Sequence, residues 1–403
     1  MKEIVVIGGG ASGYAAACAA LENAPDAVVT LLEGASRTGR KILASGNGRC
    51  NLLNDGENVY FGDAAFADRV LMNCTREDVR AFFARAGLQL APESEEDGRV
   101  YPATGQAASV MDALRAYAAR LGVKTVCDTP VTDIGYGKKG FTVNCREGRF
   151  RADRVIVCCG SPAGGKLGVD SYHLLTDLGH KLIAPVPALT PILCDMTGLA
   201  SLKGLRVPVK LTLTRKGVPL ESTEGEALFS EHGVSGVCAM QLGRAAKKGD
   251  QLHLDFAPLL ALEKRTHSHT MAPDLPGGSY DKVLKLINDR AAVMPREDLF
   301  TGLLPRVLAD VVQKRAKNVP AQARLLSDFV LDVTGVRGLD QAQVAHGGID
   351  TCEFDPDTME SRFHPGVYAA GEVLNVDGEC GGFNLLFAWA GGLIAGSRAG
   401  RSL

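Results

Sequence analysis

The strongest constraint on the fold of this chain is a glycine-rich turn that directly follows a short apolar run. Residues 4–7 are all β-branched and show no alternation, which is typical of a parallel strand covered on both faces. A Gly-x-Gly-x-x-Gly motif starts at Gly8, and an alanine-rich helix is predicted over residues 11–21. A second buried strand is predicted over residues 28–32. The pattern therefore predicts a βαβ unit in an α/β domain with a parallel sheet.

The three glycines of the motif have separate roles when a dinucleotide binds. Gly8 permits the tight turn, Gly10 lets the backbone approach a pyrophosphate, and Gly13 lets helix and strand pack closely. The N–H groups at the start of the helix then face the phosphates. Glu33 follows Gly13 by 20 residues, where its carboxylate can accept hydrogen bonds from both ribose hydroxyls and would repel a 2′-phosphate. The motif predicts a Rossmann-type dinucleotide site and leaves NAD and FAD open.

A second glycine-rich segment, near the C-terminus, favours FAD. A strand is predicted over residues 366–371, followed by Glu372, by Asp377 and by the run Gly381 to Asn384, which opens an apolar helix. This segment would suit the ribityl chain and the pyrimidine edge of a flavin, and the helix N-terminus could stabilise negative charge on the reduced ring. A purely NAD-binding domain has no use for such a segment.

The length and the change of pattern along the chain predict an interrupted domain. At about 150 residues per domain, 403 residues correspond to two or three domains. Alternating residues after about position 190 indicate antiparallel, half-exposed strands, and helical segments follow. We expect an FAD-binding domain at residues 1–189 and 346–403, and an insertion with a β-rich part at 190–257, a helical part at 258–325 and a β-rich return at 326–345.

Charge and cysteine usage narrow the function classes. Lys and Arg number 44 against 46 Asp and Glu, a formal net charge of -2, so no nucleic-acid partner is expected. The eleven cysteines contain no Cys-x-x-Cys pair, which argues against a dithiol relay. The N-terminal apolar run is too short for a signal peptide, and the 15 residues from Gly382 to Gly396 are fewer than the roughly 18 of a membrane span. We expect a cytoplasmic protein without a membrane segment.

Three segments resemble those of a known family. Gly8 to Gly13, the run Gly39 to Asn51 and the run Gly371 to Trp389 look like the BaiN-type bacterial NAD(P)/FAD-dependent oxidoreductases, which include a dehydro-bile-acid reductase and an aminoacetone oxidase. The similarity extends from end to end. The resemblance implies an FAD domain that carries an inserted β-barrel-like domain and a small helical domain.

The resemblance also implies how the cofactor lies. The loop Ser45 to Asn51 would lie along the flavin, Arg40 and Lys41 nearer the pyrophosphate or ribose, and Val131 at the adenine. Arg49 offers fixed donors for a flavin carbonyl or a substrate anion; the alternative is a glycine-rich surface turn with a charged tip. The residues expected to bind the cofactor are Gly8, Gly10, Ala11, Ser12, Gly13, Glu33, Arg40, Lys41, Ser45, Gly46, Asn47, Arg49, Cys50, Asn51, Val131, Gly160, Gly371, Glu372, Asp377, Gly381, Gly382, Asn384 and Leu385.

Candidates for acid–base catalysis lie in two places. Residues 225–237 resemble a family segment that reads Leu-Phe-Thr-His-x-Gly-x-Ser-Gly-Pro, but Glu231 stands at the histidine, His232 is displaced by one and Val237 replaces the proline. Either Glu231 or His232 could move a proton beside the flavin, although a lone histidine in a loop is more often structural. Tyr101 could donate a proton, or simply pack before a proline turn. No metal site is expected, because the histidines lack ligand spacing and His267-x-His269 alone is weak.

We therefore expect an FAD-dependent oxidoreductase that reduces an activated C=C bond of a small organic substrate, with hydride leaving flavin N5. NAD(P)H would be a transient co-substrate, because no second strand-turn-helix glycine motif occurs. One alternative is an FAD-dependent amine oxidase that releases hydrogen peroxide. Another, from a different class, is a flavoprotein that binds or modifies RNA. Neither the substrate nor the oligomeric state follows from the sequence.

Overall fold

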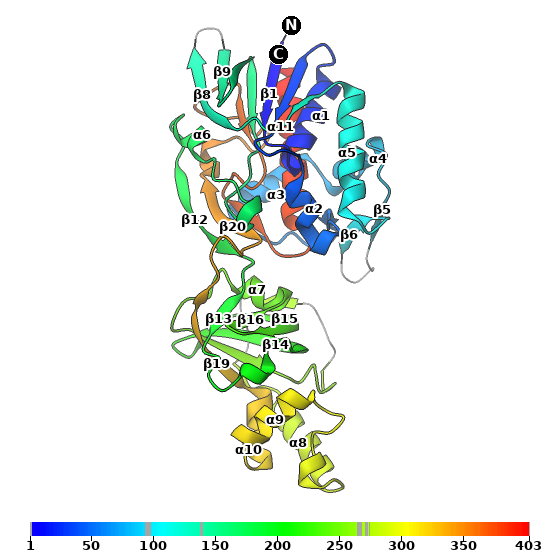
Figure 1. Ribbon diagram of the computed structural model, residues 1–403, viewed down its shortest axis with the longest axis vertical. Helices are drawn as coiled ribbons and strands as arrows, with labels where there is room; N and C mark the ends of the chain where they lie inside the picture. The colour runs from blue at the N-terminus through cyan, green and yellow to red at the C-terminus, as the bar shows by residue number, and fades with distance from the viewer. Residues whose placement is uncertain are drawn as a thin grey trace. The chain divides into compact units, whose positions relative to one another are not determined.

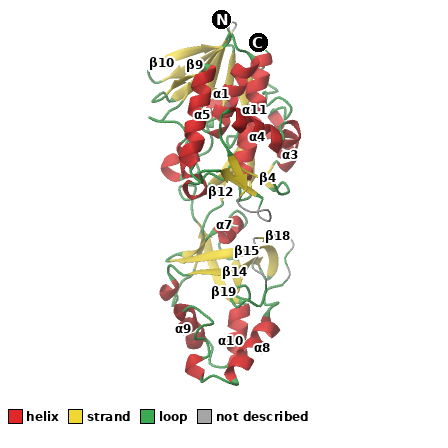
Figure 2. Cartoon of the chain, turned by 90° about the vertical axis from the view of Figure 1, so that its right-hand side faces the viewer, coloured by secondary structure: helices red, strands yellow, loops and turns green. Residues whose placement is uncertain are grey.

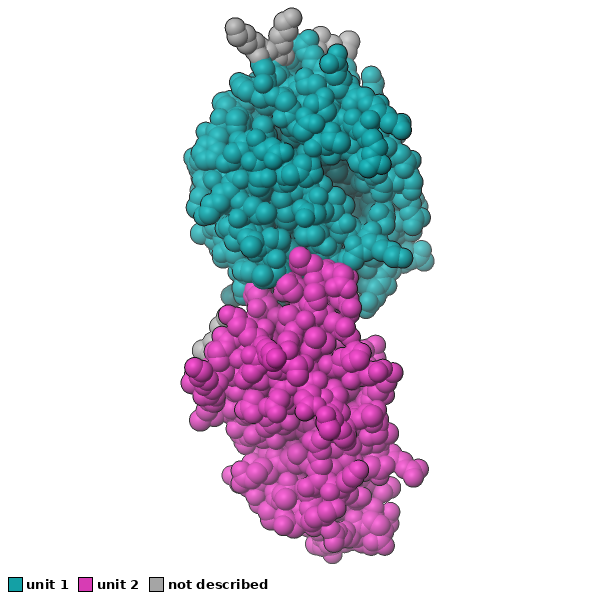
Figure 3. Space-filling model, turned by 60° about the vertical axis from the view of Figure 1, so that its left-hand side comes forward, with its two compact units in different colours: residues 1–186, 344–403 teal, residues 187–343 magenta. Residues whose placement is uncertain are grey.

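The computed structural model describes residues 2–92, 98–137, 140–263, 268–270, 273 and 275–402. The chain forms two compact units, shown in different colours in Figure 3. Unit 1 combines Met1–Val186 with Val344–Leu403, and unit 2 is Pro187–Gln343. The finer division of the insertion into β-rich and helical parts stays a prediction.

Unit 1 is built on a five-stranded parallel sheet with the order β21-β11-β1-β2-β7. Its strands are β1 (Glu3–Ile7), β2 (Val28–Leu32), β7 (Lys124–Val126), β11 (Arg154–Val157) and β21 (Val367–Ala369). The C-terminal strand β21 pairs with β11, so the two ends of the chain complete one sheet (Figure 1). This confirms the predicted α/β fold with a sequence-split Rossmann-type domain.

The other elements of unit 1 surround this sheet. The helices are α1 (Ala11–Asn23), α2 (Arg40–Ala44), α3 (Ala64–Asn73), α4 (Arg76–Arg85), α5 (Ala107–Leu121), α6 (His173–Thr176) and α11 (Phe383–Arg401). The smaller sheets contain β3 (Leu53–Asn54), β4 (Tyr60–Gly62), β5 (Leu90–Pro92), β6 (Arg99–Pro102), β8 (Val131–Gly137), β9 (Gly140–Cys145), β10 (Gly148–Ala152), β12 (Leu182–Ala188), β20 (Val344–Ile349) and β22 (Val376–Gly378).

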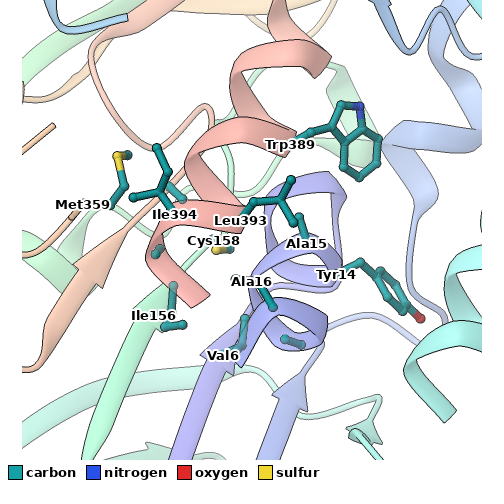
Figure 4. Packing of buried hydrophobic residues seen from close by; sticks show 14 of the residues in the cluster. Val6, Tyr14, Ala15, Ala16, Ile156, Cys158, Met359, Trp389, Leu393 and Ile394 are labelled. Atoms are coloured by element: carbon teal, nitrogen blue, oxygen red, sulfur yellow. The ribbon is translucent and has the colours of Figure 1, made fainter. Parts of the chain in front are cut away.

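Helices α1 and α11 lie side by side (Figure 4), and glycines of α11 meet the backbone of α1 at their contact. A Cβ built on Gly392 would lie 2.4 Å from the carbonyl oxygen of Ser12, and one built on Gly396 would lie 2.1 Å from that of Ala16. The residue numbers of these contacts increase along both helices, so the two helices run parallel. Phe383 begins α11 nine residues before Gly392, whereas Ser12 is the second residue of α1. The two N-termini therefore face the same way, offset by about 12 Å at 1.5 Å per residue.

The described residues of unit 2 form a closed antiparallel barrel and three longer helices (Figure 2). The strand order is β14-β17-β19-β13-β16-β15, with β18 beyond β15, and β14 also pairs with β15. This closure confirms the β-barrel-like insertion. The strands are β13 (Ile192–Cys194), β14 (Arg206–Arg215), β15 (Val218–Ser230), β16 (Gly233–Ser235), β17 (Gln251–Asp255), β18 (Ser268–Thr270) and β19 (Phe329–Val336). The helices are α7 (Val237–Leu242), α8 (Tyr280–Ala291), α9 (Arg306–Arg315) and α10 (Val319–Ser327).

Within the described ranges, no helix is both long enough and apolar enough to cross a membrane. The apolar helix α11 is instead buried in unit 1, where Trp389 is fully enclosed.

Candidate functional site: a two-part dinucleotide cradle

The glycine turn after β1 is held tightly against its neighbours. Gly8 has φ +105°, and its N–H donates to the carbonyl oxygen of Leu32. A Cβ on Gly13 would lie only 1.8 Å from the carbonyl oxygen of Gly8. Glycine is therefore required at Gly8 by conformation and at Gly13 by close packing.

Gly10 differs, because nothing lies within 4 Å of the position its Cβ would occupy. It is the N-cap of α1, and no side chain caps the helix. The first N–H groups of the helix, which include those of Ala11 and Ser12, have no intrahelical acceptor. An open space in front of an uncapped, positively polarised helix end fits a phosphate group.

Glu33 lies at the carboxyl end of β2, beside this turn. Its Oε2 accepts from the N–H of Gly9 at 2.9 Å, and its Oε1 accepts from the N–H of Ala35 at 2.8 Å. Each carboxylate oxygen can accept more than one hydrogen bond, so ribose hydroxyls can still bind. Pro130 lies 3.5 Å from the Cβ position of Gly34, which brings Val131, the predicted adenine contact, to the same edge of the sheet.

Lys41 joins the turn after β11 to the segment after β21. Its Nζ donates to Glu372 Oε2 at 3.0 Å and to the carbonyl oxygen of Ser161 at 3.0 Å, and it lies 3.8 Å from the Cβ position of Gly160. Gly371 lies against Ser12, since its Cβ would be 2.6 Å from Ser12 Oγ. The cationic Lys41 is thus placed near the start of α1. The other predicted cation, Arg40, donates to the carbonyl oxygen of Lys166 at 2.8 Å.

The loop that starts at Ser45 has an unusual backbone. Gly46 and Asn47 both lie near φ +54°, and Gly48 and Cys50 also have positive φ. A left-handed conformation is costly for a residue other than glycine and often marks a functional site. Burial raises the pKa of the Cys50 thiol to about 12, so this cysteine is a buried neutral group rather than a nucleophile.

The residues on either side of Cys50 differ in exposure. Arg49 is exposed, and its guanidinium carbon lies 4.1 Å from the ring centroid of Tyr101. Asn51 is buried, and its Oδ1 has no hydrogen-bond partner among the described residues. That oxygen lies 2.8 Å from the Cβ position of Gly382, the N-cap of α11. A buried acceptor without a partner fits a ligand that brings a donor.

The N-terminus of α11 is the second uncapped helix end. Gly382 has φ +107° and no side chain caps the helix. The neighbouring carbonyl of Gly381 accepts from Asn54 Nδ2 at 2.8 Å. The side chain of Asn384 holds the approach loop through two bonds to the backbone of Gly378; Leu385 follows it in the first helical turn. Both ends of the Asn384 amide are thus bonded to Gly378, and the role of Asn384 at the cofactor stays a prediction.

Glu231 and His232 lie in unit 2, at the turn between β15 and β16. Both residues are exposed, and Glu231 pairs with Lys203 at 2.7 Å, which lowers the pKa of its carboxyl. Their roles in proton transfer stay a prediction, as does that of Tyr101.

Sequence reasoning missed two residues in unit 1. His346 Nδ1 lies 2.6 Å from Asp377 Oδ1, and the Tyr172 hydroxyl is buried without a partner among the described residues. Nothing in the sequence pattern marks either residue, because each depends on a contact between distant segments. For metals, no cluster of three or more His, Cys, Asp or Glu able to hold an ion occurs in the described part of the chain; His267 lies outside it.

The fold and the two glycine-rich helix starts are those of the Rossmann-type class of dinucleotide-binding proteins. The chain matches the family described as HI0933-like protein Rossmann domain over residues 2–398. It is 34% identical to a 3-dehydro-bile acid delta(4,6)-reductase of Clostridium scindens, with 99% of each chain covered. It is 26% identical to a ribosomal RNA dihydrouridine synthase of Escherichia coli, covering 96% of this chain and 95% of the relative.

Among solved structures, a flavocytochrome c3 fumarate reductase in its open conformation has a TM-score of 0.51 at 15% identity, covering 99% of this chain and 78% of that one. This likeness concerns the fold alone. The chain belongs to the HI0933-like family, which confirms the resemblance to the BaiN-type proteins and the prediction of an FAD-dependent oxidoreductase at the level of the family.

Proposed function

We propose that this protein is an FAD-dependent reductase that uses NAD(P)H to saturate an activated C=C bond of a small organic substrate. The observation that carries the proposal is the pair of uncapped helix N-termini, at Gly10 and Gly382, which face the same way with an offset of about 12 Å along the helix axes. One end suits a pyrophosphate and the other suits the pyrimidine edge of a flavin, joined by a ribityl chain. If the dinucleotide were NAD, the helix N-terminus at Gly382 would have no flavin edge to bind.

FAD, when bound, would supply hydride chemistry at N5. The residues of the chain would hold and orient it. The N–H groups at the start of α1 would bind the pyrophosphate with Lys41 close by, and Glu33 would accept from the ribose hydroxyls. The N-terminus of α11, with Asn51 beside it, would hold the pyrimidine edge and favour negative charge there.

The substrate class rests on the relatives. The bile-acid reductase covers the whole chain at 34% identity, so an enone of steroid-like size is our first choice. Arg49, exposed and stacked on Tyr101, would offer a cation to an anionic group on such a substrate. NADH and NADPH are both candidates for the reductant.

Anaerobic stopped-flow spectroscopy would test the proposal in two steps. NADH or NADPH should bleach the flavin, and a steroid enone should then restore its colour with formation of the saturated ketone. The matched saturated ketone, which lacks the C=C bond, is the control and should leave the flavin reduced. Reoxidation by oxygen alone, with every enone inert, would refute the assignment.

A second candidate function is the reduction of a base in RNA. It is suggested by a relative, matched over 95% of its length, that is a ribosomal RNA dihydrouridine synthase. The formal net charge of -2 weighs against tight binding to RNA. The discriminating measurement is RNA binding at several salt concentrations. A steep loss of affinity with rising salt, together with dihydrouridine formation, would favour RNA over the small molecule.

The amine oxidase stays as a third candidate of the same cofactor class. Release of hydrogen peroxide from aminoacetone or a related amine would favour it. An inactive amine panel with an active enone would remove it.

A further inference from the structure

His346 and Asp377 form a dyad inside unit 1. His346 lies in β20 and Asp377 in β22, and Nδ1 and Oδ1 are 2.6 Å apart. The Asp377 side chain is only 1% exposed, whereas that of His346 is 32% exposed. A buried carboxylate on one ring nitrogen fixes the orientation of the imidazole and the nitrogen that carries the proton. The described residues give Nε2 no hydrogen-bond partner, so it can exchange protons with a bound molecule or water.

The residues next to the dyad in sequence are bonded to both parts of the proposed flavin site. On one side, the N–H of Ala345, next to His346, donates to Glu372 Oε1 at 3.2 Å, and Glu372 holds Lys41 through its other oxygen. On the other side, Gly378, next to Asp377, is bonded to Asn384 in the first turn of α11. Each member of the dyad is therefore next in sequence to a residue that is bonded to the border of the proposed flavin site.

We propose that His346 is the proton donor of the reduction and that Asp377 is the residue that positions it. The proposal rests on the proposed function. Saturating an enone takes one hydride and one proton. As the π bond breaks, FAD, when bound and reduced, would supply the hydride for the C–H bond at the β carbon, and the Nε2 proton of the His346 imidazolium would form the C–H bond at the α carbon. The neutral imidazole then regains a proton from water, which the exposed third of its side chain admits.

The other candidates have less suitable surroundings. The ring of Tyr101 is covered by Arg49 at 4.1 Å. His253 in unit 2 also pairs with an aspartate, Asp328 at 2.7 Å, but its Nε2 bonds to Thr214 Oγ1 at 3.1 Å. Both of its ring nitrogens are engaged, which makes this second dyad a matched control for the first.

The test separates the two half-reactions in the FAD-loaded enzyme. In His346→Gln, flavin reduction by NAD(P)H should keep the wild-type rate, while reoxidation by the enone should slow by about 100- to 10,000-fold. Asp377→Asn should slow the same step to a smaller extent. His253→Gln should match the wild type in both steps. A His346→Gln enzyme that reoxidises at the wild-type rate would overturn the dyad and leave the reductase assignment standing; a wild type that no enone reoxidises would overturn both.

A measurement on the protein without FAD guards against variants that fail to fold. Nitrogen-15 NMR of the histidine rings should show that the neutral form of His346 carries its proton on Nδ1, and Asp377→Asn should abolish that preference. If the spectrum of the wild type instead shows a mixture of both His346 tautomers, the positioning role of Asp377 is contradicted, whatever the activity of the variants.

Discussion

Gly392 of α11 lies against Ser12 of α1 so closely that a Cβ would be 2.4 Å from the Ser12 carbonyl oxygen. This contact fixes the register between two helices that come from opposite ends of the sequence. The offset of their N-termini follows from it, and with it the two-part geometry of the proposed FAD site.

Glycines along this chain should divide into packing and binding positions. Gly396→Ala would press a Cβ to 2.1 Å from the Ala16 carbonyl oxygen, so we expect the free energy of unfolding to fall by about 1–3 kcal/mol. Gly10→Ala enters open space at φ -91°. It should change that free energy by less than about 0.5 kcal/mol and weaken FAD binding about tenfold or more. Urea unfolding of the FAD-free protein and FAD titration distinguish the two; equal effects of both variants on stability would contradict this division.

Lys41 should matter for the cofactor more than for stability. Its pair with Glu372 is partly exposed, with side-chain exposures of 33% and 19%, and such pairs contribute about 0–1 kcal/mol. Lys41→Met should therefore barely alter unfolding but raise the dissociation constant for FAD. Lys181→Met, which breaks the surface pair with Asp350 at 3.1 Å, is the control and should leave FAD affinity unchanged. A normal FAD affinity in Lys41→Met would exclude Lys41 from the pyrophosphate site.

The unpaired oxygen of Asn51 predicts opposite effects with and without FAD. Asn51→Leu removes a buried acceptor that has no partner among the described residues, and leaving such a group unpaired costs about 1–3 kcal/mol. The FAD-free variant should be as stable as the wild type or more so, while the stabilisation gained on adding FAD should shrink. Asn54→Leu is the comparison, because both ends of its amide are bonded, to Gly381 and to Gly56, and it should destabilise the FAD-free protein. Thermal unfolding with and without FAD measures both the stability of the FAD-free variants and the stabilisation gained on adding FAD.

Stability should fall in mild acid because of His180. Burial lowers the pKa of this imidazole, which is bonded to Glu353 and Ser361. Above the unfolded-state pKa of about 6.5, neither state binds the proton and the stability is fully present. As the pH falls below that value, the unfolded state takes up the proton first, so the free energy of unfolding decreases. His180→Gln should flatten this decline between pH 7.5 and 5.5 in urea unfolding, whereas the exposed His173→Gln should not.

The sequence predicted most of the fold because local signals and tertiary context agree. The strand at residues 4–7, the glycines after it and Glu33 form one continuous βαβ unit, and β1, α1 and β2 match it. The apolar C-terminal helix was predicted to open with the run Gly381 to Asn384, and it begins at Phe383. These elements are encoded within short windows, where periodicity and glycine spacing are informative.

The side-chain contacts of the site were harder to predict from the sequence. The pairing of His346 with Asp377 joins two strands 31 residues apart, and the parallel register of α1 and α11 depends on glycines that look like ordinary helix residues in the sequence. Asp377 and Asn384 were predicted to bind the cofactor, and the bonds of their side chains to His346 and Gly378 do not follow from the sequence pattern. Such partners are set by the packing of distant segments, which a single sequence does not display.

The visible spectrum of the purified protein tests the central claim most directly. Our account predicts absorption bands of an oxidised flavin, release of FAD on denaturation at close to one per chain, and a large loss of that FAD in Gly10→Ala. A protein that is colourless and gains no flavin bands on titration with FAD, or one that releases a different dinucleotide, would contradict the two-part FAD site.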